Sequence, residues 1–282
     1  MKTEKVIAAL VYDFDKTLSP NNMQEYAFIP ELGLAPEKFW SMCAALEQTH
    51  RMDSILAYMR TMLQEARGKK LLTRDAFHAL GRSVALFEGV SDWFARINAY
   101  GTRLGLSIEH YVISSGLQEI IEGTSIAKEF KEIYAASFCY DEKGVPIWPA
   151  MAVNYTSKTQ FLFRINKGVL DINEHQSLNE FMPDEKRRVP FQNMIYLGDG
   201  MTDVPCMKLV KVNGGHSIAV YRDNPAIAKQ MLCQGRVDFA APAVYTEGGK
   251  LDQTVKIILK KIKASNAALA IHLKDCEWAK EV

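Results

Sequence analysis

Two aspartates placed two residues apart follow an apolar run near the start of the chain. The run covers residues 6–12, and Asp13 and Asp15 come directly after it, followed by Thr17. A spacing of two keeps both side chains on the same side of an extended backbone. Carboxylates at the end of a buried strand are costly to desolvate without a partner, and ligands bind at such strand ends in open α/β sheets. A single aspartate would fit a turn or a helix cap, whereas the pair predicts a binding site.

A second acidic motif follows another apolar run. It covers residues 198–203 and superficially resembles a glycine-rich dinucleotide loop, but Asp199 and Asp203 stand where that loop needs small residues. A loop that cradles pyrophosphate on backbone N–H groups should not place carboxylates in the same space. Carboxylate oxygens instead suit Mg²⁺, which takes hard oxygen ligands. We therefore predict that Asp13 and Asp199, from separate strands, hold Mg²⁺ between them.

A serine-containing turn and a lysine complete the candidate set. Ser114, Ser115 and Gly116 follow a third apolar run, where a hydroxyl and backbone N–H groups could hold phosphoryl oxygens, although the same tripeptide also suits an ordinary turn. Phosphoryl transfer develops negative charge on oxygen, so a fixed cation facing the metal is expected. We predict Lys158 for this place and keep Lys167 as the alternative, because most lysines are solvated and position alone does not separate the two.

Short apolar runs that end in small or oxygen-bearing residues recur along the chain. Continuous apolar runs of this length, separated by helical patterns, are typical of buried parallel strands in an α/β sheet. The predicted strands are residues 6–12, 111–113, 194–197 and 217–221, and the predicted helices are 92–104, 117–123, 226–232 and 255–262. We expect an α/β fold, a Rossmann-like parallel sheet flanked by helices, with the motif residues at the carboxyl ends of its strands.

The stretch 21–85 has a different composition from the rest of the chain. It is dominated by strong helix formers, its apolar residues fall at helical spacing, and it contains no strand-like run. An all-helical insertion after the first strand of an α/β sheet is most simply a cap. We therefore predict a helical cap domain at 21–85 and an α/β core formed by 1–20 and 86–282.

A second insertion is predicted at about 133–190. It contains strand-like runs at 134–140 and 151–155, separated by a turn. Its last part, 173–188, is polar and is predicted to be a loop.

A cap is expected to close over a site, exclude water and contact the leaving group. By location, the candidates for such contacts are His50, Arg51, Asn21, Asn22, Gln24 and Tyr26. The aromatic and methionine positions of the cap favour core packing over a substrate pocket; they are Phe39, Trp40, Met42, Met59 and Met62.

Composition excludes several classes of partner. The 282 residues carry a net charge of +1, so no overall charge attracts nucleic acid or an anionic membrane. No apolar run approaches the roughly 18 residues that a membrane span needs. The five cysteines are odd in number and form no C-x-x-C pair, which suits a reducing compartment. We expect a soluble, cytoplasmic protein whose partner is a small molecule, and the sequence leaves its oligomeric state open.

Taken in order, the motifs resemble those of a known family. Asp13-x-Asp15-x-Thr17, a strand-end Ser114, Lys158 and Gly198-Asp199-x-x-x-Asp203 are similar to the ordered motif set of the haloacid dehalogenase-like hydrolase superfamily. The helical insertion resembles the cap of the phosphoserine phosphatase-like branch of that superfamily. Lys16 departs from the pattern, since many relatives have glycine there, and its backbone must still form the turn.

The resemblance implies a Mg²⁺-dependent phosphohydrolase that cleaves a small-molecule phosphomonoester through an aspartyl-phosphate. It implies that Asp13 is the nucleophile, Asp15 the general acid and base, and Lys158 the catalytic cation. The implied metal ligands are Asp13, Asp15 through its backbone carbonyl, Asp199 and Asp203, the last of which could also orient Lys158. The implied phosphate-binding residues are Phe14, Ser114, Ser115 and Gly116. Two alternatives stay open, a phosphotransferase of the same superfamily and a non-catalytic phosphate-binding module.

Overall fold

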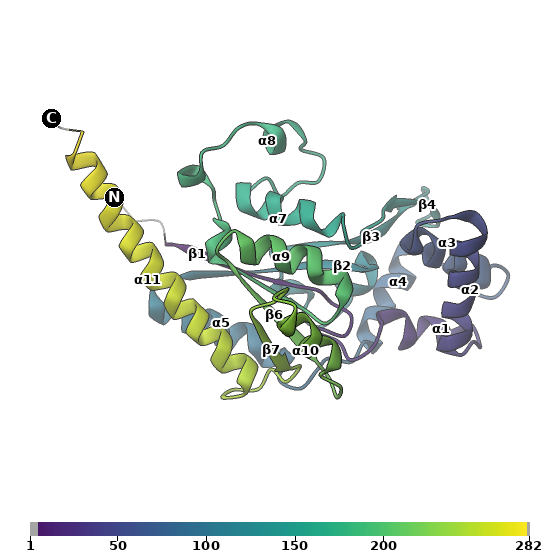
Figure 1. Ribbon diagram of the computed structural model, residues 1–282. Helices are drawn as coiled ribbons and strands as arrows, with labels where there is room; N and C mark the ends of the chain where they lie inside the picture. The colour runs from purple at the N-terminus through teal and green to yellow at the C-terminus, as the bar shows by residue number, and fades with distance from the viewer. Residues whose placement is uncertain (1–4, 281–282) are drawn as a thin grey trace.

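One sheet runs through the computed structural model, which describes residues 5–280. In that part of the chain its seven strands lie in the order β4-β3-β2-β1-β5-β6-β7 (Figure 1). They are β1 (Ile7–Tyr12), β2 (Ser107–Leu117), β3 (Glu132–Tyr140), β4 (Pro146–Met151), β5 (Met194–Gly198), β6 (His216–Tyr221) and β7 (Phe239–Pro242). Neighbouring strands are parallel, except that β4 runs antiparallel to β3. The predicted Rossmann-like sheet is confirmed, with an antiparallel strand at one edge.

Helices cover both faces of the sheet, because successive side chains of a strand point to opposite sides. Leu10 and Tyr12 of β1 pack into one apolar cluster, and Ala9 and Val11 pack into the other. The first face is covered by α5 (Val90–Leu104), α6 (Gln118–Glu122) and α11 (Lys250–Trp278). The second is covered by α7 (Lys158–Lys167), α9 (Val204–Val212) and α10 (Ala226–Cys233). This double covering explains why β1 and β5, at the centre of the sheet, are apolar without interruption.

The segment between β1 and α5 is helical throughout its regular structure, as predicted. Its helices are α1 (Phe28–Glu31), α2 (Pro36–His50), α3 (Ser54–Ala66) and α4 (Arg74–Leu80), and Figure 1 shows them grouped at one end of the sheet. Asp53 caps α3 by accepting a hydrogen bond from the Ile55 N–H at 2.9 Å. Phe77 of α4 stacks on Phe138 of β3 with ring centroids 5.7 Å apart, so α4 is anchored on the sheet. The assignment of 21–85 as a separate cap domain stays a prediction.

The stretch 133–190 differs in part from its prediction. β3 matches the strand predicted at 134–140 and belongs to the main sheet, but the strand predicted at 151–155 is wrong, since β4 ends at Met151. Asn154 accepts hydrogen bonds from the N–H groups of Thr156 and Ser157, which turns the chain into α7, a helix that was not predicted. The polar stretch after α7 carries only the short α8 (Gln176–Asn179) and brief 3₁₀ turns among the described residues.

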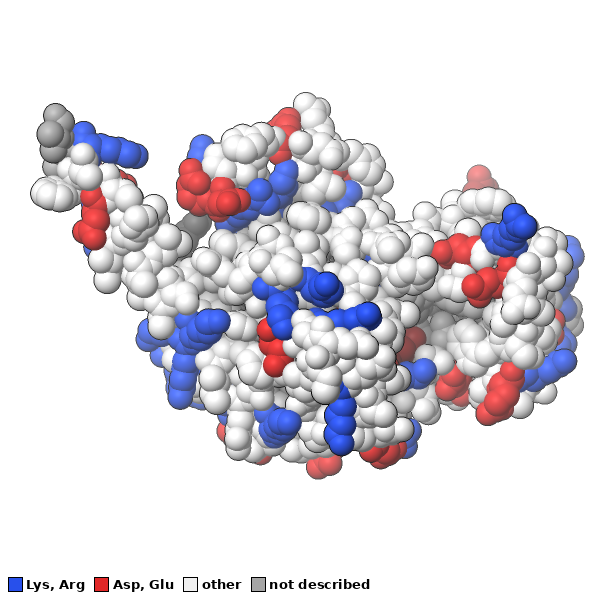
Figure 2. All heavy atoms as spheres, viewed as in Figure 1, with Lys and Arg blue, Asp and Glu red and all other residues white. Residues whose placement is uncertain are grey.

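The surface and the cysteines agree with the composition. Lys and Arg side chains are interspersed with Asp and Glu over the face seen in Figure 2. All five cysteines are free thiols in the structure. Between residues 5 and 280 no helix combines the length and the apolar character that a bilayer crossing requires. A cytoplasmic location stays a prediction.

Candidate active site

Strand register brings the acidic motifs together. β1 lies between β2 and β5, and Tyr12 pairs with Val112 on one side and Leu197 on the other. The backbone N–H of Asp13 donates to the carbonyl of Leu197 at 2.9 Å, so Asp13 starts beside the end of β5. Residues that are far apart in sequence thus share one edge of the sheet, where parallel strands end.

Asp13, Asp199 and Asp203 form one carboxylate cluster, and Lys158 forms ion pairs with two of its members. One carboxylate oxygen from each aspartate lies within 4.8 Å of the other two. Lys158 Nζ lies 3.0 Å from Asp13 Oδ1 and 2.8 Å from Asp203 Oδ1, and its side chain is 1% exposed. The hydroxyl of Tyr196 also donates to Asp203 Oδ1, at 2.9 Å. Lys158 is the first residue of α7, and the helix dipole disfavours a cation at that end of a helix. The neighbouring carboxylates therefore stabilise the charged form of Lys158.

Lys167, the alternative lysine, lies elsewhere. It is the last residue of α7, and its ammonium donates to the backbone carbonyls of Leu178 and Glu180, at 2.6 Å each. The structure therefore brings Lys158 to the carboxylates and places Lys167 under the loop that follows α7. Nothing in the spacing of the two lysines could distinguish these positions, because both lie within one helix that was not predicted.

The cluster has the composition of a divalent-cation site. Three carboxylates face one ammonium, so negative charge is in excess. Burial raises the pKa of Asp13 to about 6, although the charge of Lys158 opposes this shift. Burial, with repulsion from Asp203 and Asp13, raises the pKa of Asp199 to about 8. Both shifts mark carboxylates that are held together without enough positive charge, and oxygen donors of this kind fit Mg²⁺.

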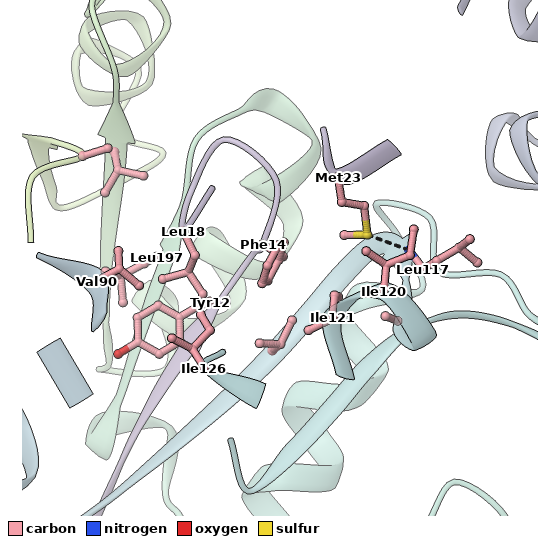
Figure 3. Close-up of a cluster of buried hydrophobic side chains, with 14 of the residues drawn as sticks. Tyr12, Phe14, Leu18, Met23, Val90, Leu117, Ile120, Ile121, Ile126 and Leu197 are labelled. Carbon is pink, nitrogen blue, oxygen red and sulfur yellow. Dashed lines mark hydrogen bonds between the residues drawn. The ribbon is translucent and has the colours of Figure 1, made fainter. Parts of the chain in front are cut away.

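The side chain of Asp15 is fixed by a hydrogen bond outside this cluster. Its Oδ1 accepts from the backbone N–H of Met23 at 2.8 Å. Met23 in turn packs in the apolar cluster of Figure 3, where its sulfur accepts from the N–H of Leu117 at 3.2 Å. Burial, and then repulsion from Asp13, raise the pKa of Asp15 well above its ordinary value. A carboxyl that retains its proton beside an ionised neighbour has the property that a general acid requires.

The predicted phosphate-binding residues lie at the end of β2 and just after β1. Ser114 is buried, and its Oγ accepts from the N–H of Gly116 at 3.0 Å, which leaves its own O–H free to donate. Ser115 is tied to α3, since its carbonyl accepts from the Tyr58 hydroxyl at 2.8 Å. The side chain of Phe14 is buried in the apolar cluster (Figure 3), so only its backbone can face a phosphate. Lys16 adopts a φ of 59°, the left-handed conformation that the turn requires.

A cavity of about 280 Å³ lies between the helical segment and the end of β2. Asp15, Asn22, Gln24, Ser115 and Gly116 are among its lining residues, and all five were site candidates from the sequence. It is also lined by Trp40, Cys43, Ala44, Glu47, Ser54, Ile55 and Tyr58. Trp40 packs against the core, as its helical spacing favours, and it also lines the cavity, which helical spacing cannot show.

Four of the cap candidates lie away from the cavity. Asn21, Tyr26, His50 and Arg51 are not among the described residues that line it. The Tyr26 hydroxyl accepts hydrogen bonds from the Asn21 N–H at 3.0 Å and from Ser19 Oγ at 2.9 Å, which makes it part of a turn. Arg51 ends α2 in a left-handed conformation, next to the exposed His50.

Comparison with known proteins decides the family. The family model described as haloacid dehalogenase-like hydrolase matches residues 10–208, a range that contains the motifs from Asp13 to Asp203. The chain belongs to the haloacid dehalogenase-like hydrolase family. An uncharacterized protein from Borreliella burgdorferi is 30% identical in an alignment of 281 positions, gaps included, that covers 89% of this chain and 96% of that protein. The resemblance predicted from the motifs is confirmed at the level of the family.

Solved structures with the same fold include other members of this family. A substrate-bound phosphoserine phosphatase superposes with a TM-score of 0.57 and 15% identity, covering 90% of this chain and 99% of the other. A haloacid dehalogenase family hydrolase from Salmonella enterica serovar Typhi gives a TM-score of 0.57 and 13% identity, covering 90% of this chain and 72% of the other. At such identities the likeness establishes the fold, and the chemistry has to be argued from the site itself.

Proposed function

We propose that the protein is a Mg²⁺-dependent phosphatase that cleaves small-molecule phosphomonoesters through an aspartyl-phosphate on Asp13. The observation that carries this proposal is the position of Asp13, whose carboxylate meets Lys158 at 3.0 Å and shares a cluster with Asp199 and Asp203. Asp15 stands at the wall of the adjoining cavity. Membership of a hydrolase family supports the same reaction class.

In the first step, Asp13 attacks the phosphorus atom and the bond from phosphorus to the ester oxygen breaks. Asp15 donates its proton to the departing oxygen, which leaves as a neutral alcohol. In the second step, a water molecule attacks the same phosphorus, gives its proton to Asp15, and the bond to Asp13 breaks, releasing phosphate. A carboxylate nucleophile thus divides one displacement into two easier ones.

The other residues of the site would hold charge in place. Lys158 balances part of the charge of Asp13 and Asp203, so that an anionic ester can approach. Asp13, Asp199 and Asp203 offer carboxylate oxygens for Mg²⁺, and the backbone carbonyl of Asp15 is a further candidate ligand. When bound, Mg²⁺ would shield the nucleophile from the negative charge of the phosphoryl group. The free O–H of Ser114 is suited to a phosphoryl oxygen.

The experiment is a hydrolysis assay with and without Mg²⁺ on wild type and Asp13→Asn. We expect wild type to release phosphate from an aryl phosphate only with Mg²⁺, and Asp13→Asn to be inactive. Asp75→Asn, on the exposed side of α4, is the matched control and should keep full activity. Borohydride reduction during turnover, followed by peptide mass analysis, should modify residue 13 and no other aspartate.

The alternatives give different results in the same assay. A phosphotransferase would transfer the phosphoryl group to an added alcohol faster than to water and would still depend on Asp13. A non-catalytic module would leave wild type and Asp13→Asn equally inert across a panel of phosphomonoesters. That last result would overturn the proposed function.

A further inference from the structure

The cavity beside Asp15 shows which part of a substrate it can hold. It is bounded by α2 and α3 on one side and by Ser115 and Gly116 on the other. Under the proposed function, on which this inference rests, the phosphoryl group lies at Asp13, so the alcohol portion of the ester extends past Asp15 into this space. A volume of about 280 Å³ lies near the lower limit of ligand pockets, about 300 Å³, which favours a short alcohol.

The charge of the cavity wall has one sign. Its acidic lining residues are Glu47 and Asp15; Asp15 holds its proton in the proposed first step, so Glu47 supplies the negative charge, and no Lys, Arg or His of the described chain lines the cavity. A third carboxylate, Glu25, lies behind the wall, where its Oε1 accepts from the Trp40 indole N–H at 2.8 Å. An alcohol that carried a carboxylate would therefore lose its hydration without gaining a positively charged partner. A cationic alcohol would meet the opposite sign of charge.

Two aromatic rings form part of the same wall. Trp40 and Tyr58 lie edge to face with centroids 6.3 Å apart. Their polar atoms are already engaged, Trp40 with Glu25 at 2.8 Å and Tyr58 with the Ser115 carbonyl at 2.8 Å. These bonds fix both rings and leave them apolar toward a ligand. Fixed, electron-rich rings beside carboxylates are a favourable environment for an ammonium group.

Gln24 adds an unused acceptor to this wall. The residue is 2% exposed and lines the cavity, and its Oε1 is buried without a hydrogen-bond partner in the described structure. A buried amide oxygen without a partner is costly, so such groups in native proteins call for a donor. An N–H of a bound ammonium group would supply that donor.

We propose that the leaving alcohol of the natural substrate is short and carries an ammonium group, which binds among Trp40, Glu47 and Gln24. The rings exclude water around the ammonium group, the carboxylate of Glu47 supplies opposite charge, and Gln24 accepts an N–H. The cavity therefore selects amino-alcohol phosphates over esters of the same size that are neutral and over amino-acid phosphates that carry a carboxylate.

The test compares three esters in the presence of Mg²⁺. 2-Aminoethyl phosphate and propyl phosphate have nearly the same size and differ in the positive charge, whereas O-phosphoserine has the same ammonium group with an added carboxylate. We expect 2-aminoethyl phosphate to have a kcat/KM at least about tenfold higher than either of the others, the scale of one desolvated cation–π contact. Equal kcat/KM values for 2-aminoethyl and propyl phosphate would overturn the inference.

A charge reversal at the cavity wall gives an independent test. Glu47 is exposed on α2, so Glu47→Lys should fold normally, and it should lower the preference for 2-aminoethyl over propyl phosphate by about fivefold. Glu37→Lys makes the same change on the same helix, away from the cavity, and should leave the preference unchanged. A preference that is identical in wild type and Glu47→Lys would count against the assigned position of the ammonium group.

The two proposals fail in different ways. The enzyme could hydrolyse all three esters equally well, in a reaction that requires Asp13. This result would overturn the proposed substrate class and leave the proposed phosphatase activity standing. Wild type and Asp13→Asn could both fail to hydrolyse the three esters and an aryl phosphate. This result would overturn the proposed phosphatase activity and the substrate class together.

Discussion

Replacement of Lys158 by methionine should destabilise the protein as well as inactivate it. Lys158 Nζ lies 2.8 Å from Asp203 Oδ1 and 3.0 Å from Asp13 Oδ1, and the Lys158 and Asp203 side chains are 1% and 0% exposed. At an effective dielectric constant of about 20, each pair has a gross attraction of about 5–6 kcal/mol. Much of this is offset by desolvation, but truncating one partner leaves buried carboxylates without a cation. We therefore expect the free energy of unfolding to fall by about 3–5 kcal/mol.

Urea unfolding in the presence of a chelator measures this loss, and a second substitution tests its cause. Adding Asp203→Asn to Lys158→Met removes one of the two uncompensated charges, so the double variant should recover at least about half of the lost stability. Lys167→Met, on the same helix, removes two hydrogen bonds to loop carbonyls but leaves no buried charge, so it should cost about 1–2 kcal/mol, less than Lys158→Met, and keep the activity. Lys158→Met should lower kcat by about a hundredfold to a thousandfold.

The pH dependence gives the electrostatic explanation a further check. The pKa of Asp13 is already raised from 3.8 to about 6, and Lys158 opposes that rise, so the pKa in Lys158→Met should be higher still. A carboxyl whose pKa is raised in the folded state destabilises the fold above its unfolded pKa and regains stability as it takes up a proton. The deficit of Lys158→Met should therefore shrink as the pH falls. A deficit that is constant with pH, or a double variant weaker than the single one, would refute this reasoning.

Three further perturbations test other parts of the site and the fold. Asp15→Asn should lower kcat for alkyl phosphates by about a hundredfold to ten-thousandfold, and less for an aryl phosphate, whose leaving group needs little protonation; equal losses for both esters would contradict an acid role. Asp199→Asn should raise the melting temperature measured without Mg²⁺, because repulsion in the cluster falls. The same substitution should abolish the increase in melting temperature that Mg²⁺ causes in wild type. An unchanged increase with Mg²⁺ would exclude Asp199 as a ligand. Burial lowers the pKa of His110 to about 3. Below about pH 6.5, urea unfolding should therefore show that wild type loses stability relative to His110→Gln, by up to about 1.4 kcal/mol per pH unit. If the stabilities of the two proteins change with pH in parallel, His110 does not titrate in this way.

Much of the core could be predicted because its strands are buried on both faces. A strand such as β1 has no solvent face, so its sequence is an apolar run that ends abruptly at Asp13. The polar residues after such a run mark the strand end, and parallel strands bring their ends together. That logic places Asp13, Ser114 and Asp199 at one edge of the sheet before any coordinates are known.

The edges of the fold could not be predicted in the same way. β7 has only four residues, and β4 lies at the edge of the sheet with exposed residues such as Trp148, so neither forms a continuous apolar run. The helix α7 begins after a turn made by the Asn154 side chain, a local hydrogen bond that composition does not reveal. Its omission left the choice between Lys158 and Lys167 open.

The cavity beside Asp15 was the least predictable part, because it joins segments whose patterns describe packing. Trp40 and Tyr58 fall at helical spacing like their buried neighbours, and only tertiary structure shows that both rings also line a cavity. Gln24 stood out by location alone, whereas its lack of a hydrogen-bond partner requires coordinates. Specificity in such a site depends on which side chains from two distant segments meet, and no single segment records that.

The charge of the site links its stability to its chemistry. Asp13, Asp199 and Asp203 repel one another, and the single ammonium of Lys158 contacts Asp13 and Asp203. The fold holds these groups together by means of the apolar strands beneath them, so the repulsion is a cost that the core must exceed. Under the proposed function, a bound divalent cation would lower that cost, and an approaching phosphate ester would restore it in part. The excess negative charge that makes the cluster unfavourable by itself is therefore the same property that would bind the metal, and a separate carboxylate, Glu47, would favour a cationic alcohol in the adjoining cavity.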